Sequence, residues 1–120
     1  MEAIRAGVIQ VQGTMNGFGE RCGNCNLISV VANILQKTDK TCLHNPDNLK
    51  NLKAVSQFIN EQANLRDNQR APFVGDSAFA HKAGMHVDGV RKNSDSFEHI
   101  LPESVGNKRR ILISDLSGAR

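Results

Sequence analysis

The segment 12–24, QGTMNGFGERCGN, places four glycines within eleven residues, together with an acid, a base, a cysteine and two asparagines. A short strand-like run precedes it and an amphipathic helical pattern follows it. Glycine lets a backbone turn sharply or approach a ligand closely. A glycine-rich turn from strand to helix also presents free N–H groups to an anion. We therefore expect this loop to belong to an active site of which the chain supplies only a part.

The glycine spacing excludes two common nucleotide sites. Gly17, Gly19 and Gly23 form a pattern that is one residue too long for the dinucleotide-binding fingerprint, and no acid follows a second strand at the expected distance. No Gly-Lys-Ser or Gly-Lys-Thr ends the loop, so a phosphate-binding P-loop is excluded as well.

The residues before the loop predict a helix end and a strand. Gly7 is placed to end a helix that covers the first residues of the chain. The segment 8–12, VIQVQ, is typical of a strand with Ile9 and Val11 on one face. Two glutamines on the other face fit either a polar cavity or an edge strand that faces water, and the pattern leaves both open.

Helical periodicity returns after the loop. Apolar residues at helical spacing predict a helix that fades near Thr38, with Asn24 or Asn26 as its N-cap. A second helix is expected to be capped by Asp47 and to end around Asn64. Its apolar stripe comprises Leu49, Leu52, Val55, Ser56 and Ile59, with Phe58 beside it.

The last third of the chain is less regular. Asp76 or Ser77 is placed to cap a helix within the segment 73–92. Pro102 suits the start of a short helical turn. The segment 110–114, RILIS, is expected to form a second strand.

Composition excludes several classes of protein. The chain has 120 residues, a net charge of +3, five Phe and no Trp or Tyr, so its core must be mostly aliphatic. The only basic cluster, 108–110, is too small for a nucleic-acid surface, and no apolar run could span a membrane. Three cysteines argue against a secreted disulfide framework, so we expect a cytoplasmic protein.

The cysteines and histidines allow two other functions, redox chemistry and zinc binding, with weaker support. Cys22 and Cys25 form a C-x-x-C pair at an expected helix start, which could be redox-active, or could bind zinc together with Cys42 and His44. The second half of that zinc pattern has unusual spacing, and incidental cysteines are the simpler interpretation. His86 follows His81 by five residues, which does not place both on one helical face as a metal-binding pair requires.

Three motifs in order resemble one enzyme family. Residues 10–24 (QVQGTMNGFGERCGN), 77–90 (SAFAHKAGMHVDGV) and 102–107 (PESVGN) look like segments of the 2-isopropylmalate synthase, homocitrate synthase and citramalate synthase family. The resemblance covers nearly the whole chain. Residues 76–82, 98–100 and 108–118 look most like the citramalate synthase branch.

The resemblance implies an α+β fold that is predominantly helical. It implies the last strand and helix of a TIM barrel over residues 1–40, including the glycine-rich loop, and a small helical subdomain over residues 41–107. Residues 108–120 would form a strand and a linker. A loop after the last barrel strand lies where TIM barrels place their active sites.

The family implies a reaction and roles for particular residues. Its members condense acetyl-CoA with a 2-oxo acid, with a divalent cation (Mg, Mn or Zn) that polarises the oxo group. Asn24 matches the metal-ligating asparagine, and His86 matches the histidine assigned to acid–base chemistry in a dimer. The loop residues would bind acetyl-CoA and assemble the site, with Glu20 also expected to be catalytic; they are Gly17, Gly19, Glu20, Arg21 and Gly23.

Two departures from the family pattern matter. Phe97 stands near the place of a family tyrosine, so any role of that hydroxyl is lost. The family's Asp-Arg strand and its His-x-His metal pair have no counterpart in the chain. We therefore expect a C-terminal piece of the catalytic region that is inactive alone. Its strand at 8–12 would lack barrel neighbours and would pair with a symmetry mate, be covered by a helix or fray, so we expect a homodimer or an intertwined assembly. A non-catalytic helical interaction module is the alternative.

Overall fold

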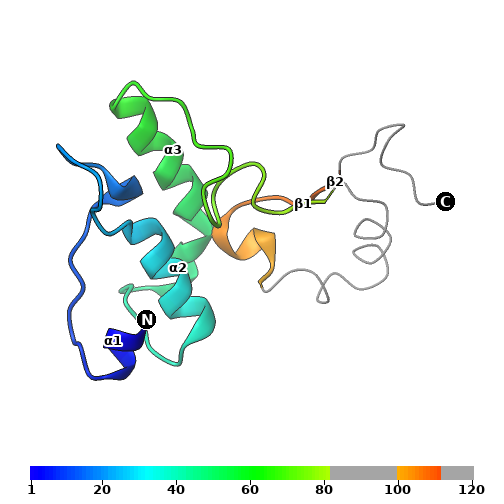
Figure 1. Ribbon diagram of the computed structural model, residues 1–120. Helices are drawn as coiled ribbons and strands as arrows, with labels where there is room; N and C mark the ends of the chain where they lie inside the picture. Colours follow the sequence, from blue (N-terminus) through cyan, green and yellow to red (C-terminus); the bar gives the residue numbers. More distant parts are fainter. Residues whose placement is uncertain (82–99, 112–120) are drawn as a thin grey trace.

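The computed structural model describes residues 1–81 and 100–111, and most of the regular secondary structure in these ranges is helical (Figure 1). This agrees with the predicted fold class. The α-helices are α1 (Glu2–Arg5), α2 (Leu27–Lys37) and α3 (Leu52–Gln62), and the 3-10 helices are η1 (Met15–Gly17), η2 (Pro46–Asn51) and η4 (Pro102–Val105). The strands are β1 (Ala80–His81) and β2 (Arg110–Ile111). No helix in the described ranges is both long and apolar enough to cross a membrane.

Helix α2 forms where the periodicity predicts it. The Oδ1 atom of Asn26 accepts a hydrogen bond of 3.0 Å from the backbone N–H of Ile28, so Asn26 is the N-cap and Asn24 is free for another role. The helix ends at Thr38, whose hydroxyl donates a hydrogen bond of 2.6 Å to the carbonyl of Ile34. The prediction that the helix fades at Thr38 is confirmed.

Helix α3 begins differently from the prediction. Asn45 accepts a hydrogen bond from the N–H of Asp47 and caps η2, which leads directly into α3, so the prediction that Asp47 is the cap was wrong. Asparagine and aspartate are both good caps, and Pro46 at the first helical position decides which of the two precedes the helix. Leu52 and Ser56 are buried as expected, whereas Phe58 is 56% exposed.

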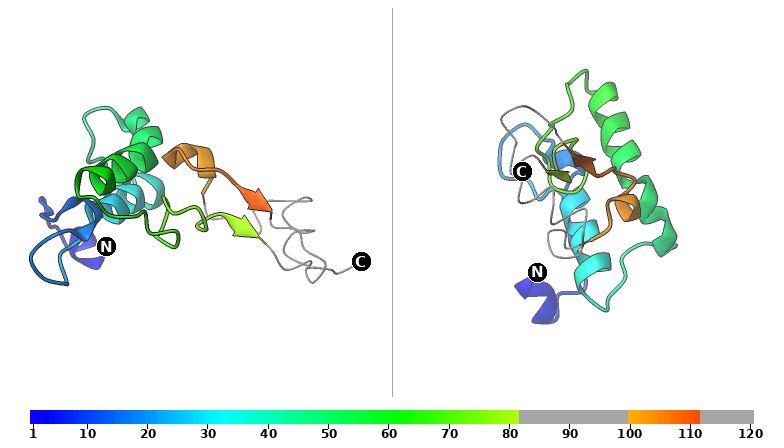
Figure 2. Two further views of the ribbon diagram at one scale, coloured as in Figure 1. Left: turned by 90° about the horizontal axis from the view of Figure 1, so that it is seen from above. Right: turned by 90° about the vertical axis from the view of Figure 1, so that its right-hand side faces the viewer.

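One hydrophobic core connects the helices to the irregular segments. Helix α2 packs near α3, and η4 lies beside the N-terminal end of α3 (Figures 1 and 2). The buried members of this core are Ile28, Ala32, Leu49, Leu52, Val74, Phe79 and Val105. Burial of these side chains is the main stabilising contribution available to so small a chain. The division into segments 1–40, 41–107 and 108–120 stays a prediction.

The strand predicted at 8–12 does not form. Ile9 is 101% exposed, and Val8 and Val11 are 45% and 38% exposed. Within the described residues the backbone N–H groups from Ile9 to Gly13 have no hydrogen-bond partner. A strand needs a neighbouring strand for its ladder of hydrogen bonds, and no neighbour lies beside this segment in the described part of the chain.

The helix predicted to start at Asp76 or Ser77 is also absent from the described residues. The segment forms turns, in which Ser77 N–H donates to the carbonyl of Gln69, and then enters β1. The Asp76 carboxylate accepts from Lys53 and Arg110 through Oδ1 and caps no helix within the described residues. Residues 82–92 lie outside the described ranges.

Strand β1 pairs in parallel with β2, with Ala80 opposite Arg110. In Figure 2 this pair extends away from the helices. The predicted strand 110–114 is thus confirmed at Arg110 and Ile111, and its remainder lies outside the described residues. The helical turn predicted at Pro102 is confirmed as η4.

Candidate active-site loop

Two backbone hydrogen bonds close the glycine-rich loop at its base. Thr14 N–H donates to the carbonyl of Cys25, and Leu27 N–H donates to the carbonyl of Thr14, both at 2.9 Å. This small parallel bridge connects the loop to the start of α2. A Cβ atom at Gly13 would lie 2.5 Å from the carbonyl oxygen of Cys25, so only glycine fits at this close approach.

Asn24 reaches across the inside of the loop. Its Nδ2 donates a hydrogen bond of 3.0 Å to the carbonyl of Phe18. A Cβ atom at Gly19 would lie 1.9 Å from that same nitrogen, so Gly19 leaves the room that the Asn24 amide occupies. Within the described residues the Asn24 Oδ1 accepts no hydrogen bond. An anchored amide with a free carbonyl oxygen suits a hard divalent cation, so this residue fits the predicted metal role.

The remaining predicted site residues of the loop surround this amide. Gly17 and Gly23 have positive φ angles of 73° and 98°, which shape the loop's turns. Glu20 and Arg21 are exposed, and neither side chain has a hydrogen bond or ion pair in the part of the chain that the structure describes. The structure therefore brings Gly19 and Asn24 together and leaves the charged pair facing solvent. His86 and Phe97 lie outside the described residues.

A polar network holds the loop on α3, and the sequence analysis missed it. Asn16 has a φ of 58°, an unusual value for a residue with a side chain. Its Oδ1 accepts a hydrogen bond of 2.6 Å from the Ser56 hydroxyl. Its Nδ2 donates to the Ser56 carbonyl at 2.9 Å and to Asn60 Oδ1 at 3.1 Å. The Asn60 amide in turn donates to Asp67 at 2.8 Å. One sequence signal was available: polar Ser56 and Asn60 are four residues apart on the buried face of α3.

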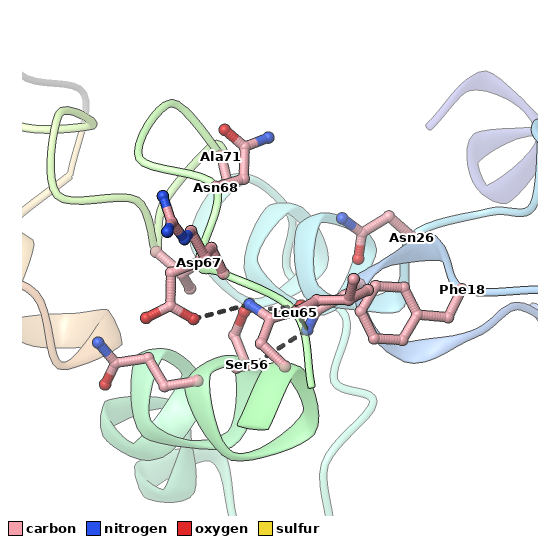
Figure 3. A pocket seen from close by; sticks show the side chains of 12 residues that line it. Phe18, Asn26, Ser56, Leu65, Asp67, Asn68 and Ala71 are labelled. Carbon is pink, nitrogen blue, oxygen red and sulfur yellow. Dashed lines mark hydrogen bonds between the residues drawn. The ribbon is translucent and has the colours of Figure 1, made fainter. Parts of the chain in front are cut away.

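This network lines a cavity of about 230 Å³ beside the loop. Figure 3 shows the Ser56 and Asp67 side chains at its floor, with Phe18 and Leu65 on one side. Four of the polar residues that line it, Asn16, Ser56, Asn60 and Asp67, are joined by hydrogen bonds. Residues of the glycine-rich loop and of α3 therefore line the same cavity.

The structure does not support a zinc site. Cys22, Cys25 and Cys42 are all exposed and free. Among the described residues no three His, Cys, Asp or Glu side chains are grouped closely enough to hold a metal ion. Desolvation of its sulfur raises the pKa of the Cys42 thiol, which disfavours the thiolate that zinc requires. Incidental cysteines, the simpler of the predicted alternatives, agree with these observations.

Two family models match the chain in succession. Residues 1–59 match the HMGL-like family, and residues 73–120 match the family described as homocitrate synthase post-HMGL domain-like. The chain is 48% identical to an (R)-citramalate synthase of Geobacter sulfurreducens over 118 residues, which is 98% of the chain. The chain belongs to the citramalate and 2-isopropylmalate synthase family. This confirms the resemblance drawn from the three motifs.

The sequence identity of the chain is higher to the citramalate synthases than to the 2-isopropylmalate synthase. The chain is 49% identical to an (R)-citramalate synthase of Synechocystis over 97% of its length, and 39% identical to a 2-isopropylmalate synthase of Shigella sonnei over 98%. The chain spans about a fifth of the length of these relatives: 22% of the Geobacter protein, 21% of the Synechocystis protein and 23% of the Shigella protein. The glycine-rich loop lies in the HMGL-like match, whereas His86 and Phe97 lie in the second match.

Proposed function

We propose that the chain is part of an acyltransferase that condenses acetyl-CoA with a 2-oxo acid. Pyruvate is the proposed acid, which gives citramalate for branched-chain amino-acid biosynthesis (isoleucine and, in related enzymes, leucine) in the cytoplasm. In this reaction a base removes a proton from the acetyl methyl group, and the enolate attacks the carbonyl carbon of the oxo acid. Water then hydrolyses the thioester and releases coenzyme A.

One observation carries the proposal. The chain matches an (R)-citramalate synthase at 48% identity over nearly its whole length, compared with 39% for a 2-isopropylmalate synthase. The higher identity favours pyruvate as the acid. The built geometry of the Asn24 amide supports the same class of reaction, because it prepares a hard oxygen donor at the end of a glycine-rich loop.

We assign the first proposed roles to residues of the glycine-rich loop. When bound, a divalent cation (Mg, Mn or Zn) polarises the oxo group of the acid. Asn24 would hold that cation through Oδ1, while Phe18 and Gly19 keep the amide in place. Exposed Glu20 and Arg21 would face the acetyl-CoA substrate, with Glu20 as a catalytic residue and Arg21 as a cation for the coenzyme.

The remaining proposed roles concern the backbone and the second match. Gly17, Gly19 and Gly23 let the loop backbone approach the coenzyme. His86 would transfer protons in the acid–base steps, acting in a homodimer. We also propose that residues 1–40 are the last strand and helix of a TIM barrel, although residues 8–12 of the described chain form no strand. Because the chain spans 22% of the Geobacter relative, we propose that these 120 residues alone do not catalyse condensation.

A chimera tests the proposal directly. The matched segment of the Geobacter sulfurreducens relative is replaced by this chain, and release of coenzyme A is measured with acetyl-CoA and either pyruvate or a branched 2-oxo acid. We expect an active enzyme that prefers pyruvate. In it, His86→Ala should lower turnover about 10²- to 10⁴-fold, the range for a lost general acid or base. Asn24→Ala should lower turnover and weaken metal binding about a hundredfold.

The control variant is Cys22→Ala, which changes an exposed cysteine of the same loop and should leave turnover unchanged. A folded chimera without activity would contradict the proposal, as would full activity of the His86→Ala variant. Condensation by the 120-residue chain alone would overturn the statement that it is inactive by itself.

A further inference from the structure

A second cavity, of about 400 Å³, lies between α3 and the segment that leads into β2. The roles proposed above do not use it. Three cationic side chains and one carboxylate line it; the lining residues are Lys53, Ala54, Gln57, Asp76, Gly106, Lys108 and Arg110. The cavity therefore has an excess of positive charge.

The single carboxylate is already shared. Asp76 Oδ1 accepts a hydrogen bond of 2.7 Å from Lys53 Nζ and one of 3.2 Å from Arg110 Nη2. The hydrogen bond from Lys53 is the main reason that the pKa of Asp76 is lowered, so the group is ionised at neutral pH. One carboxylate cannot neutralise both cations and Lys108 as well.

Hydrogen-bond donors are left over in this cavity. Lys53 uses two of its three N–H groups, for Asp76 and for Asn107 Oδ1 at 2.9 Å. The Lys108 ammonium has no partner among the described residues, and Arg110 uses a single contact out of five possible N–H donors. A ligand with several acceptor oxygens would satisfy these groups together.

The frame around these donors is rigid. Asn107 is 3% exposed, and its amide donates hydrogen bonds of 2.9 Å to the carbonyls of Phe73 and Gly75. The Lys53 side chain is only 12% exposed and is held from both sides by Asn107 and Asp76. Fixed donors bind an anion with a smaller loss of entropy than mobile surface lysines do.

We propose that this cavity binds a phosphate group of a phosphorylated small molecule. A phosphate monoester carries more charge and more acceptor oxygens than a carboxylate, and it suits combined recognition by arginine and lysine. The volume of about 400 Å³ exceeds a single phosphate and leaves space for a larger molecule attached to it.

Gln57 suggests which molecule that is. It lines both this cavity and the smaller one beside the glycine-rich loop, so one ligand could extend along α3 between them. Coenzyme A carries its phosphates far from its acetyl group, which fits this arrangement. This assignment to coenzyme A rests on the proposed function, whereas the phosphate site itself does not.

The test titrates the 120-residue chain with inorganic phosphate, coenzyme A and dephospho-coenzyme A by isothermal titration calorimetry. Lys108→Gln and Arg110→Gln should each weaken phosphate binding about tenfold, the loss expected for one charge-assisted hydrogen bond. Lys108→Arg should preserve binding. Lys50→Gln is the control, because Lys50 is exposed, lies outside the cavity and changes the net charge equally. Circular dichroism confirms that each variant is folded.

The outcomes distinguish the existence of the phosphate site from its assignment to coenzyme A. Tighter binding of coenzyme A than of dephospho-coenzyme A, lost in Lys108→Gln, would identify coenzyme A as the ligand. Dephospho-coenzyme A lacks only the 3′-phosphate monoester and keeps the diphosphate. Equal binding of both, with phosphate binding still lost in Lys108→Gln, therefore supports the phosphate site and overturns its assignment to the 3′-phosphate of coenzyme A. If Lys50→Gln weakens phosphate binding as much as Lys108→Gln, or if neither cavity variant weakens it, the site does not exist.

Discussion

Gly19 is the residue on which the geometry of the loop depends most directly. It contacts the side chain that the family resemblance assigns to the metal, and any Cβ atom there would lie inside the Asn24 amide. Glycine is needed at this position because the absence of a Cβ atom leaves room for the Asn24 side chain, and not because of its own backbone angles. The positive φ angles at Gly17 and Gly23 are the other use of glycine in this loop.

We expect Gly19→Ala to displace the Asn24 amide. The added methyl group would lie 1.9 Å from Nδ2, so the hydrogen bond to Phe18 must break or the backbone must move. In ¹⁵N NMR spectra the Asn24 side-chain NH₂ resonances should shift strongly, and the free energy of unfolding should fall by about 1–3 kcal/mol.

Gly23→Ala is the matched control for that variant. Gly23 has a φ of 98°, but a Cβ atom there meets nothing within 4 Å. This variant should therefore show backbone strain of about 1–3 kcal/mol without a shift of the Asn24 side-chain resonances. Equal shifts in both variants would contradict the role of Gly19.

Helix α3 holds the loop through a network of hydrogen bonds. Ser56 and Asn60 hold both ends of the Asn16 amide, and Asn60 also binds Asp67 in the segment after the helix. Buried polar networks of this kind stabilise one arrangement because any partial break leaves a group without a partner. The positive φ of Asn16 is stabilised by the same contacts.

We expect Asn60→Ala to destabilise the chain by about 1 kcal/mol, since half-buried Asn16 and exposed Asp67 each lose a hydrogen-bond partner. Urea unfolding monitored by circular dichroism measures this loss. Gln62→Ala, an exposed position on the same helix, should change the free energy of unfolding by less than about 0.5 kcal/mol. Equal effects of the two substitutions would show that the network adds no stability.

At the scale of the whole molecule, an apolar face is left uncovered by the residues that the structure describes. Exposed Val8, Ile9 and Val11 lie beside apolar residues of α2, and together they line an open cavity of about 660 Å³. The N–H of Val8 donates to the carbonyl of Ala3, whereas the N–H groups of residues 9–11 find no partner in the part of the chain that the structure describes. Apolar surface next to unpaired backbone is typical of an interface.

We expect the 120-residue chain to associate through this face, as predicted for a homodimer. Light scattering should give a molar mass near twice the 13.1 kDa of the chain. Ile9→Asp should shift the mass toward that of the monomer, because it places a charge in the centre of the face. Phe58→Asp, at an exposed apolar position on α3 outside this face, should not. A monomer at all concentrations would contradict the prediction.

The sequence by itself determined the features that depend on neighbours along the chain. Helix α2, its end at Thr38, the turn at Pro102 and the close approach of the glycine-rich loop all follow from local periodicity, capping and glycine placement. The three motifs were enough to place the chain in its family. Local rules narrowed the N-cap of α2 to two asparagines but could not choose between them.

Tertiary structure decided everything that needs a partner distant in sequence. The segment 8–12 has strand-like residues but no neighbouring strand among the described residues, and a strand without hydrogen-bonded neighbours gains too little to form. Asp76 is a good helix cap by residue type, yet in the folded chain its carboxylate contacts Lys53 and Arg110, which are 23 and 34 residues away in sequence. The contact of Asn16 with α3 spans more than forty residues of sequence, from Asn16 to Asn60. Such pairings arise only from the folded packing, because no local pattern specifies which distant side chain will complete a buried hydrogen bond.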